Sequence, residues 1–334
     1  MKWTGSSDKC HIDHIDKKRW LFAMYTICFG IMVMLVFGRF LYYGKSFVGG
    51  ADGLSQVAPT MQYTGQYYRA LLKNILQGNL QIPMWDMSIG FGMNILQVIS
   101  FDPVYILCSV LFVHDIAVGI AIFDMLCLYL AGIMFIALCY NLGCNRYAAL
   151  AAALAYIFNG YILNYCIAQN SFLRLFIVLP MILLGVYNVT KKNRYGIFVL
   201  AVLYNITLGP LNIYTIGIVL IFCFCMAYIF SDRKKGVADF FSYIWKPVLI
   251  YILEMLVMAV FLIPTMYKVV SGGRIGNASI NFQWLYDVSY YRSLFHGLVG
   301  VDEIGIHGYI GVTTIAILAV VCLVIKGNKS LLEK

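Results

Sequence analysis

The stretch Trp20–Leu41, WLFAMYTICFGIMVMLVFGRFL, decides the fold of this chain. Its only charged residue is Arg39, and about 20 apolar residues are enough to cross a bilayer as a helix. The basic cluster Lys17–Arg19 comes directly before it and predicts that this end of the helix faces the cytoplasm. The run is too long for a signal peptide and has no small-residue cleavage site. We therefore expect an uncleaved first membrane span.

The composition of the whole chain extends this interpretation. Hydrophobic residues make up 62% of the sequence and charged residues 12%, with a mean hydropathy of +0.82. A soluble domain has roughly 45–50% apolar and about 25% charged residues. So little charge cannot coat a water-facing globule, and irregular backbone cannot face lipid because its amide groups would stay unpaired. The fold class predicted is all-α: a polytopic transmembrane helical bundle.

Hydropathy and charge predict about eight spans in one transmembrane domain at residues 20–326, between cytoplasmic tails at 1–19 and 327–334. The spans are expected at residues 20–41, 116–140, 147–165, 172–189, 195–209, 211–230, 248–266 and 309–325. Outer loops are expected at 42–115 and 267–308, and an inner loop at 231–247. Both termini are then cytoplasmic.

The first outer loop has structure of its own. Pro59–Gln77 has the spacing of an amphipathic helix that lies in the membrane interface. The apolar segment Val104–Val113 is too short for a full crossing, so we expect a re-entrant or interfacial segment there. Counting it as a span would move Arg146 and the cluster Lys191–Arg194 to the outer side, against the positive-inside pattern.

The net charge of +9 does not indicate nucleic-acid binding. Most of the 24 Lys and Arg residues fall on the predicted inner side of the membrane, where they set the orientation of the spans. The partner that this distribution indicates is the lipid bilayer, and no nucleic acid is expected.

Asp52 is the candidate with the sharpest local pattern, since Gly49, Gly50 and Gly53 surround it just beyond the first span. Glycines allow a tight turn and close approach of a ligand to the backbone. The carboxylate is then either a general base or a ligand for a divalent cation. The alternative is an ordinary Asx turn after a helix.

Asp102 and Arg174 are the candidates at the membrane surface. Asp102 precedes Pro103 at the start of the short segment, where it either caps a helix or faces Asp52 across a pocket roofed by the 57–77 helix. Arg174 lies about one turn inside a span. Its guanidinium either binds a lipid-linked phosphate or extends to the headgroups.

The remaining candidates lie in the two outer loops. Trp85 and Asp86 form an interfacial anchor beside a flexible Gly90–Gly92 loop, with sugar stacking on Trp85 as the functional alternative. Arg274 follows two glycines that could make a phosphate-binding nest, and Arg292 lies further along the same loop.

These motifs together resemble a known family. The pattern reads Gly49-Gly50-x-Asp52-x-x-x-Gln56, a proline, an amphipathic helix, Trp85-Asp86-x-x-x-Gly90-x-Gly92 and Phe101-Asp102-Pro103. It resembles the YfhO-type bacterial membrane proteins, which look like members of the GT-C glycosyltransferase superfamily. The resemblance covers roughly residues 20–325. Members of this type normally continue through more spans and an outer soluble domain, so this chain is expected to be an N-terminal or truncated version.

The resemblance implies a function. The expected reaction moves a sugar from a polyprenyl-phosphate carrier to a cell-envelope acceptor such as a teichoic-acid-type polymer, at the bacterial plasma membrane. Asp52 would be the catalytic acid of the first loop, and Asp102 would lie near the carrier phosphate. The substrate-binding set is expected to comprise Asp102, Gln56, Trp85, Asp86, Arg174, Arg274 and Arg292. A divalent cation is the one cofactor considered, and no ligand set for it is assigned.

Two other classes of function remain open. The first is a transporter or flippase for a lipid-linked substrate, which would use Arg174, Asp124 and the turn at Gly209-Pro210. The second is a catalytically silent membrane scaffold.

Overall fold

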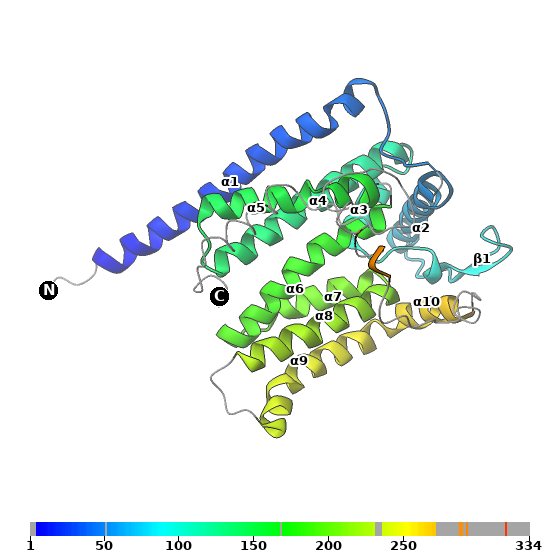
Figure 1. Ribbon diagram of the computed structural model, residues 1–334. Coiled ribbons are helices and arrows are strands. Elements are labelled where there is room, and N and C mark those ends of the chain that lie inside the picture. Colours follow the sequence, from blue (N-terminus) through cyan, green and yellow to red (C-terminus); the bar gives the residue numbers. More distant parts are fainter. Residues whose placement is uncertain are drawn as a thin grey trace. The chain divides into compact units, whose positions relative to one another are not determined.

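The computed structural model describes residues 5–50, 52–167, 169–230, 236–271, 287–289, 292 and 318. Within these residues the protein is all-α, with ten α-helices and a single two-stranded hairpin (Figure 1). The predicted fold class is confirmed. The expected span 309–325 lies outside the described residues apart from Leu318, as does Arg274.

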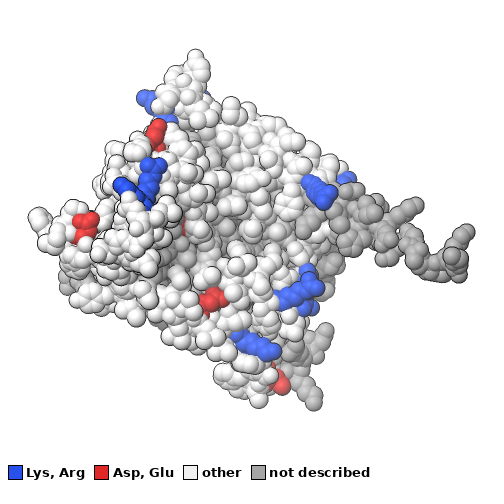
Figure 2. Space-filling view, turned by 180° about the vertical axis from the view of Figure 1, so that it is seen from behind, with Lys and Arg blue, Asp and Glu red and all other residues white. Residues whose placement is uncertain are grey.

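Four described helices are long and apolar enough to cross a membrane: Arg19–Tyr42, Ile116–Asn141, Asn170–Lys192 and Val237–Val257. Three shorter apolar helices accompany them: Arg146–Ile157, Gly196–Thr207 and Thr215–Ile229. Figure 2 shows one face of the molecule, on which charged side chains are sparse. The protein is therefore a membrane protein, while the number of eight spans stays a prediction.

The chain forms two compact units. Unit 1 comprises Met1–Lys45, Leu128–Tyr165 and Tyr286–Lys334, and unit 2 comprises Ser46–Cys127 and Cys166–Leu285. We describe each unit by itself.

Unit 1 is built on helix α1 (Gly5–Tyr42), the second half of α4 (Ile116–Asn141) and α5 (Arg146–Ile157). Tyr25 of α1 is fully buried, stacks on Tyr129 at 5.5 Å between ring centroids and donates its hydroxyl hydrogen to the Tyr129 carbonyl oxygen at 3.0 Å. Gly132 makes this contact possible, because a Cβ there would collide with the Tyr25 hydroxyl.

A second contact in unit 1 bears on the path of the chain. The Arg146 guanidinium lies over the Trp20 ring, 4.7 Å from its centroid. Trp20 and Arg146 are therefore at the same end of unit 1. Two residues lie at the same end if the chain crosses the membrane an even number of times between them. The expected spans 20–41 and 116–140 give two crossings when the short 104–113 segment is not counted as a span.

Unit 2 contains α2 (Ala58–Leu76), α3 (Pro103–Leu111), the first half of α4, α6 (Leu173–Lys192), α7 (Gly196–Thr207), α8 (Pro210–Ile229), α9 (Val237–Val257) and α10 (Ala259–Ser271). Helices α6 and α7 pack closely, since a Cβ on Gly185 would lie 2.8 Å from the Phe198 Cα. Asn193 ends α6 in the left-handed region at φ 51°. Lys191 and Lys192 occupy the last turn, so the basic residues mark one end of this unit.

Helices α2 and α3 agree with their sequence predictions. Helix α2 begins and ends one residue before the expected Pro59–Gln77. Helix α3 has only nine residues and is too short to cross a bilayer. Gly65 of α2 lies directly against the Ser109 carbonyl oxygen of α3 and leaves no room for a Cβ. Arg69 adds hydrogen bonds to the carbonyl oxygens at the end of α3, which a helix alone leaves unsatisfied.

Some predicted boundaries are wrong. Residues 237–247 were expected in a loop, yet they form the first half of α9, where Phe240 packs on Tyr228 at 5.2 Å. The expected span 248–266 is interrupted at Met258, where α9 ends and α10 begins. The expected span 147–165 is also interrupted, because α5 ends at Ile157.

The Trp85 region is a hairpin and not only a flexible loop. Strand β1 (Trp85–Asp86) pairs antiparallel with β2 (Met93–Asn94). The turn needs positive φ at three consecutive residues, Gly90, Phe91 and Gly92. Glycine takes that conformation without strain, which accounts for two of the three residues.

Candidate functional site

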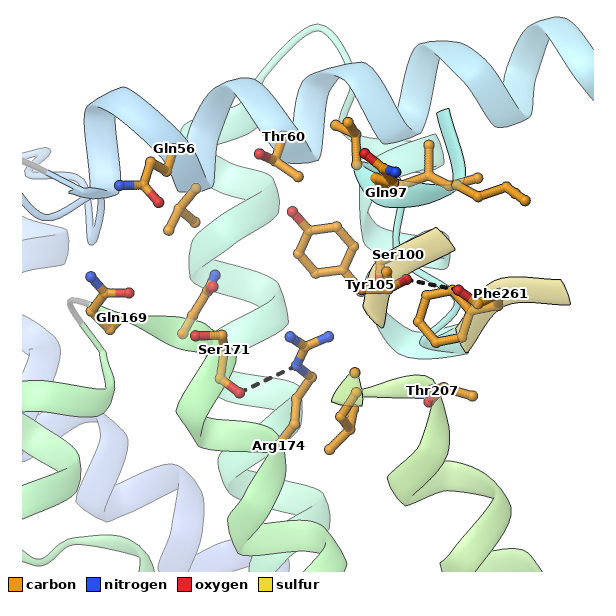
Figure 3. Close-up of a pocket in the computed structure, with 18 residues that line it drawn as sticks. Gln56, Thr60, Gln97, Ser100, Tyr105, Gln169, Ser171, Arg174, Thr207 and Phe261 are labelled. Carbon is orange, nitrogen blue, oxygen red and sulfur yellow. Dashed lines mark hydrogen bonds between the residues drawn. The ribbon is translucent and has the colours of Figure 1, made fainter. Parts of the chain in front are cut away.

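A cavity of about 280 Å³ opens in unit 2 (Figure 3). It lies where α6 begins and α7 ends, at the opposite end of these helices from Lys191 and Lys192. The first turns of α2, the 96–100 segment, α3 and α10 complete its walls. The polar side chains that line it are Gln56, Thr60, Gln97, Ser100, Tyr105, Gln169, Asn170, Ser171, Arg174, Thr207 and Thr265.

Asp52 lies behind one wall of the cavity. Its Oδ1 accepts a hydrogen bond from Gln56 Nε2 at 2.8 Å, and its Oδ2 accepts one from Gln169 Nε2. Both glutamines line the cavity, whereas Asp52 does not. The carboxylate makes no cap hydrogen bond to its own turn, so the Asx-turn alternative does not describe it. Asp52 instead joins two segments that are 117 residues apart.

The backbone after Asp52 has an unusual form. Residues Gly53–Val57 make a π-helical turn that leads directly into α2. Such turns are rare and occur frequently at functional sites. The turn places Gln56 where its amide contacts Asp52 and lines the cavity at the same time.

Asp102 caps α3, as the sequence predicts. Its Oδ1 accepts from the backbone N–H groups of Val104 at 2.9 Å and Tyr105 at 3.4 Å. Its Oδ2 accepts from the Tyr204 hydroxyl at 3.3 Å and lies 3.6 Å from Arg174 Nη1. Asp102 is fully buried and does not line the cavity. Its contact with the cavity runs through Arg174.

Arg174 projects into the cavity from the first turn of α6 (Figure 3). Its Nε donates to the Ser171 carbonyl oxygen at 3.4 Å, and its guanidinium carbon lies 5.8 Å from the Tyr105 ring centroid. The side chain is 12% exposed. Only part of its donor set is used by these contacts, because a guanidinium carries five N–H groups. The geometry leaves donors available to an anion in the cavity.

The cavity therefore connects both predicted carboxylates indirectly. Gln56 and Gln169, which bind Asp52, line the same cavity as Arg174, which pairs with Asp102. Val57 and Thr60 place the start of α2 over it. Sequence reasoning missed Gln169 and Tyr204 as partners of these carboxylates. No local signal identifies them, since each lies more than a hundred residues from its carboxylate.

Comparison with known proteins settles the family. A family model described as bacterial membrane protein YfhO matches residues 24–329. This chain belongs to the YfhO family. No curated protein and no solved structure matched it. The matched range includes the cavity of this YfhO protein and all the motifs on which the resemblance rested.

Other predicted site residues of the YfhO protein lie away from the cavity lining. Trp85 is exposed and donates its indole N–H to Met87 Sδ at 3.2 Å. Asp86 accepts from Ser88 N at 2.8 Å, Ser88 Oγ at 2.7 Å and the Tyr63 hydroxyl at 2.7 Å. The hydrogen bonds from Ser88, and then that from Tyr63, lower the pKa of the Asp86 carboxyl. Arg292 is exposed in the short stretch of its loop that the structure describes.

A divalent cation finds no ready ligand set in the described part of this YfhO protein. No group of three or more His, Cys, Asp or Glu side chains is placed there to hold a metal ion. Near the cavity, both oxygens of Asp52 accept from glutamine amides, and Asp102 is committed to α3, Tyr204 and Arg174. We assign no step to a metal.

Proposed function

We propose that this YfhO protein transfers a sugar from a polyprenyl-phosphate carrier to a hydroxyl group of a cell-envelope acceptor, such as a teichoic-acid-type polymer. The observation that carries the proposal is the cavity itself. One wall presents a guanidinium with free donors at Arg174, and another presents amides that orient the Asp52 carboxylate. An anionic link between a polar head and an apolar tail suits such a site in a membrane protein.

The chemistry is a single inverting displacement. The acceptor hydroxyl gives its proton to the Asp52 carboxylate as its oxygen attacks the anomeric carbon. The bond from that carbon to the phosphate oxygen breaks, and the polyprenyl phosphate leaves with the electron pair. Arg174 stabilises the charge that develops on the leaving phosphate. No covalent glycosyl-enzyme forms.

The contacts of Asp52 are compatible with this role. An ionised carboxylate has about four lone-pair sites, and the two amide contacts use two of them. The two amide donors fix the carboxylate in one orientation. The remaining lone pairs are available for an acceptor hydroxyl that reaches past the amides of Gln56 and Gln169.

Arg174 and its partner Asp102 supply the binding half of the proposal. The Asp102 pair fixes the guanidinium at the cavity wall, so less side-chain entropy is lost when a phosphate binds. We place this end of unit 2 on the outer side of the membrane, with both termini in the cytoplasm. Lys191 and Lys192 at the opposite end of α6 support that orientation.

The experiment compares Asp52→Asn with the wild type in membranes or nanodiscs, supplied with polyprenyl-phosphate sugar and acceptor. Asparagine keeps the size and removes the basic carboxylate, so transfer should fall by about 10² or more. Arg174→Gln should weaken binding of the donor. Asp115→Asn is the matched control, since Asp115 is exposed, lies outside the cavity lining and belongs to no predicted site, and it should transfer at the wild-type rate. Equal rates in the wild type and Asp52→Asn would refute the role of Asp52.

The alternative functions give different results in the same experiment. A flippase would move the lipid-linked sugar across vesicles without consuming it and would depend on Arg174 more than on Asp52. A scaffold would tolerate both substitutions while keeping its place in the membrane.

A further inference from the structure

Asp124 is a buried acid that the proposed reaction does not use. It lies on the part of α4 in unit 2, it is fully buried, and neither of its oxygens makes a hydrogen bond to any described residue. The one hydrogen-bonding partner indicated for Asp124 is the Asn170 side chain, and that contact falls short of full hydrogen-bond geometry. Asn170 is itself only 3% exposed, its Nδ2 is also unpartnered, and it lines the cavity. The unsatisfied Asn170 amide therefore lines the cavity, and the unsatisfied Asp124 carboxyl lies behind it.

The charges around Asp124 do not balance. Tyr105 of α3 and Cys127 of α4 each interact electrostatically with the same three charged groups, Asp102, Asp124 and Arg174. Asp102 and Arg174 form an ion pair, so the Asp124 carboxylate has no cation of its own among the described residues. An isolated buried carboxylate is very costly, and proteins avoid it by pairing or by protonation.

Among the residues that the structure describes, no other group in this neighbourhood can supply the missing positive charge. The titratable side chains that face the cluster are Tyr105 and Cys108 from α3, Cys127 from α4 and Tyr204 from α7. All four are neutral when protonated and carry negative charge when ionised. An anion bound to Arg174 would add further negative charge to the same region.

We propose that Asp124 is a proton-binding site linked to the cavity, and that it is protonated whenever an anionic group occupies the cavity beside Arg174. The proton comes from cavity water past Asn170 and binds one Asp124 oxygen, and the added negative charge of the anion favours this protonated form over the carboxylate. No other bond forms or breaks. The proposal rests on the anion-binding half of the proposed function, and it holds for sugar transfer and for transport alike.

The test uses farnesyl phosphate as the probe, with the full-length protein in nanodiscs. Infrared difference spectroscopy should detect the carbonyl band of a protonated carboxylic acid in the probe-bound wild type, with a shift in D₂O. Asp124→Asn should lose that band. Glu254→Gln is the matched control, because Glu254 is another buried acid whose oxygens make no hydrogen bond to a described residue, and it lies on α9 away from the cavity lining. It should keep the band.

Binding measured against pH gives a second readout. As the pH rises, the ratio of wild-type affinity to Asp124→Asn affinity should fall by up to about tenfold per pH unit. This fall is expected over the pH range in which Asp124 is ionised in the free protein. The phosphate of the probe titrates identically in both proteins, so the ratio removes its contribution. If Asp124→Asn does not fold, Asp124→Glu with carbon-13-labelled aspartate replaces it, and the band should no longer respond to the label.

The outcomes separate the two proposals. A folded wild type that binds no farnesyl phosphate at any pH contradicts the anion site at Arg174, and the proposed function with it. Probe binding without an acid band, or with a band that Asp124→Asn keeps, overturns the proton site alone. Binding that requires Na⁺ and shows no acid band would overturn it as well, since a metal cation would then balance the charge.

Discussion

Replacing Asp102 with alanine removes every interaction of one buried carboxylate at once. The carboxylate caps α3, accepts the Tyr204 hydroxyl and pairs with Arg174. Alanine loses all three interactions and leaves the guanidinium without its partner. Asparagine keeps a capping oxygen, because Asn and Asp are equally good at this position. The two substitutions therefore separate the cap from the charge.

The geometry sets the size of each effect. A lost N-cap costs about 1 kcal/mol and a lost neutral hydrogen bond about 0.5–1.5 kcal/mol. Breaking a fully buried ion pair costs about 3–5 kcal/mol, but the 3.6 Å separation and the water-accessible cavity reduce this here to about 1–2 kcal/mol. Asp102→Ala should thus lose about 3–4 kcal/mol and Asp102→Asn about 1–2 kcal/mol.

Thermal unfolding in one detergent, followed by tryptophan fluorescence, measures the ranking. At roughly 2–4 °C per kcal/mol, Asp102→Ala should lower the melting temperature by roughly 6–16 °C. Asp115→Ala is the control, because the Asp115 side chain caps the start of α4 through Val118 N at 3.3 Å and the residue is exposed. The Asp115→Ala protein should lose only the stability that one N-cap contributes, about 1 kcal/mol.

The double variant Asp102→Ala with Arg174→Met completes the test. Once the guanidinium is gone, alanine at position 102 no longer leaves a charge unpaired. The combined loss should therefore be smaller than the sum of the single losses by more than about 0.5 kcal/mol. Additive losses, or an Asp102→Ala protein as stable as Asp115→Ala, would refute the pairing argument.

Two further predictions concern the first outer loop and the topology. In a cysteine-free background, a cysteine at Asn79 should react with an impermeant reagent in intact cells and one at Asn193 should not; the reverse pattern would contradict the topology. The hydrogen bonds from Ser88 and Tyr63 lower the pKa of Asp86, so their stabilisation of the hairpin is complete above the ordinary aspartate pKa of about 4. It is lost as the pH falls through the lowered value. Trp85 fluorescence should report that loss below about pH 4, and Ser88→Ala should move it to higher pH.

The parts of the fold that local sequence determines were predictable. Helix α2 follows from its amphipathic spacing and from Pro59 in its first turn, and α3 from the Asp102-Pro103 start and its short apolar run. The cap by Asp102 is a contact across two or three residues, which sequence alone can specify. All of these features depend on neighbours along the chain.

The features that failed depend on distant neighbours. The sequence prediction misses the start of α9 at Val237, because the basic residues before it indicate a loop over the whole of 231–247. The aromatic face of α9 packs on α8 and extends the helix back to Val237. The link from Gln169 to Asp52 and that from Tyr204 to Asp102 have no counterpart in local pattern. Only the packed unit brings those partners together.

The packing below the cavity favours transfer over transport. Val178 and Ile182 follow Arg174 along α6 at one-turn spacing, and both are fully buried in one hydrophobic cluster with Ala201 and Val202 of α7. A flippase must move the polar head of its substrate past this level, and interiors packed at crystal-like density cannot admit it without separating the two helices. The close approach of Gly185 to Phe198 lies at the same interface, one further step toward Lys191. A transferase needs no such opening. The polar head of a transferase's substrate stays at the cavity, where the Arg174 guanidinium and the amide-bound Asp52 carboxylate are already in place.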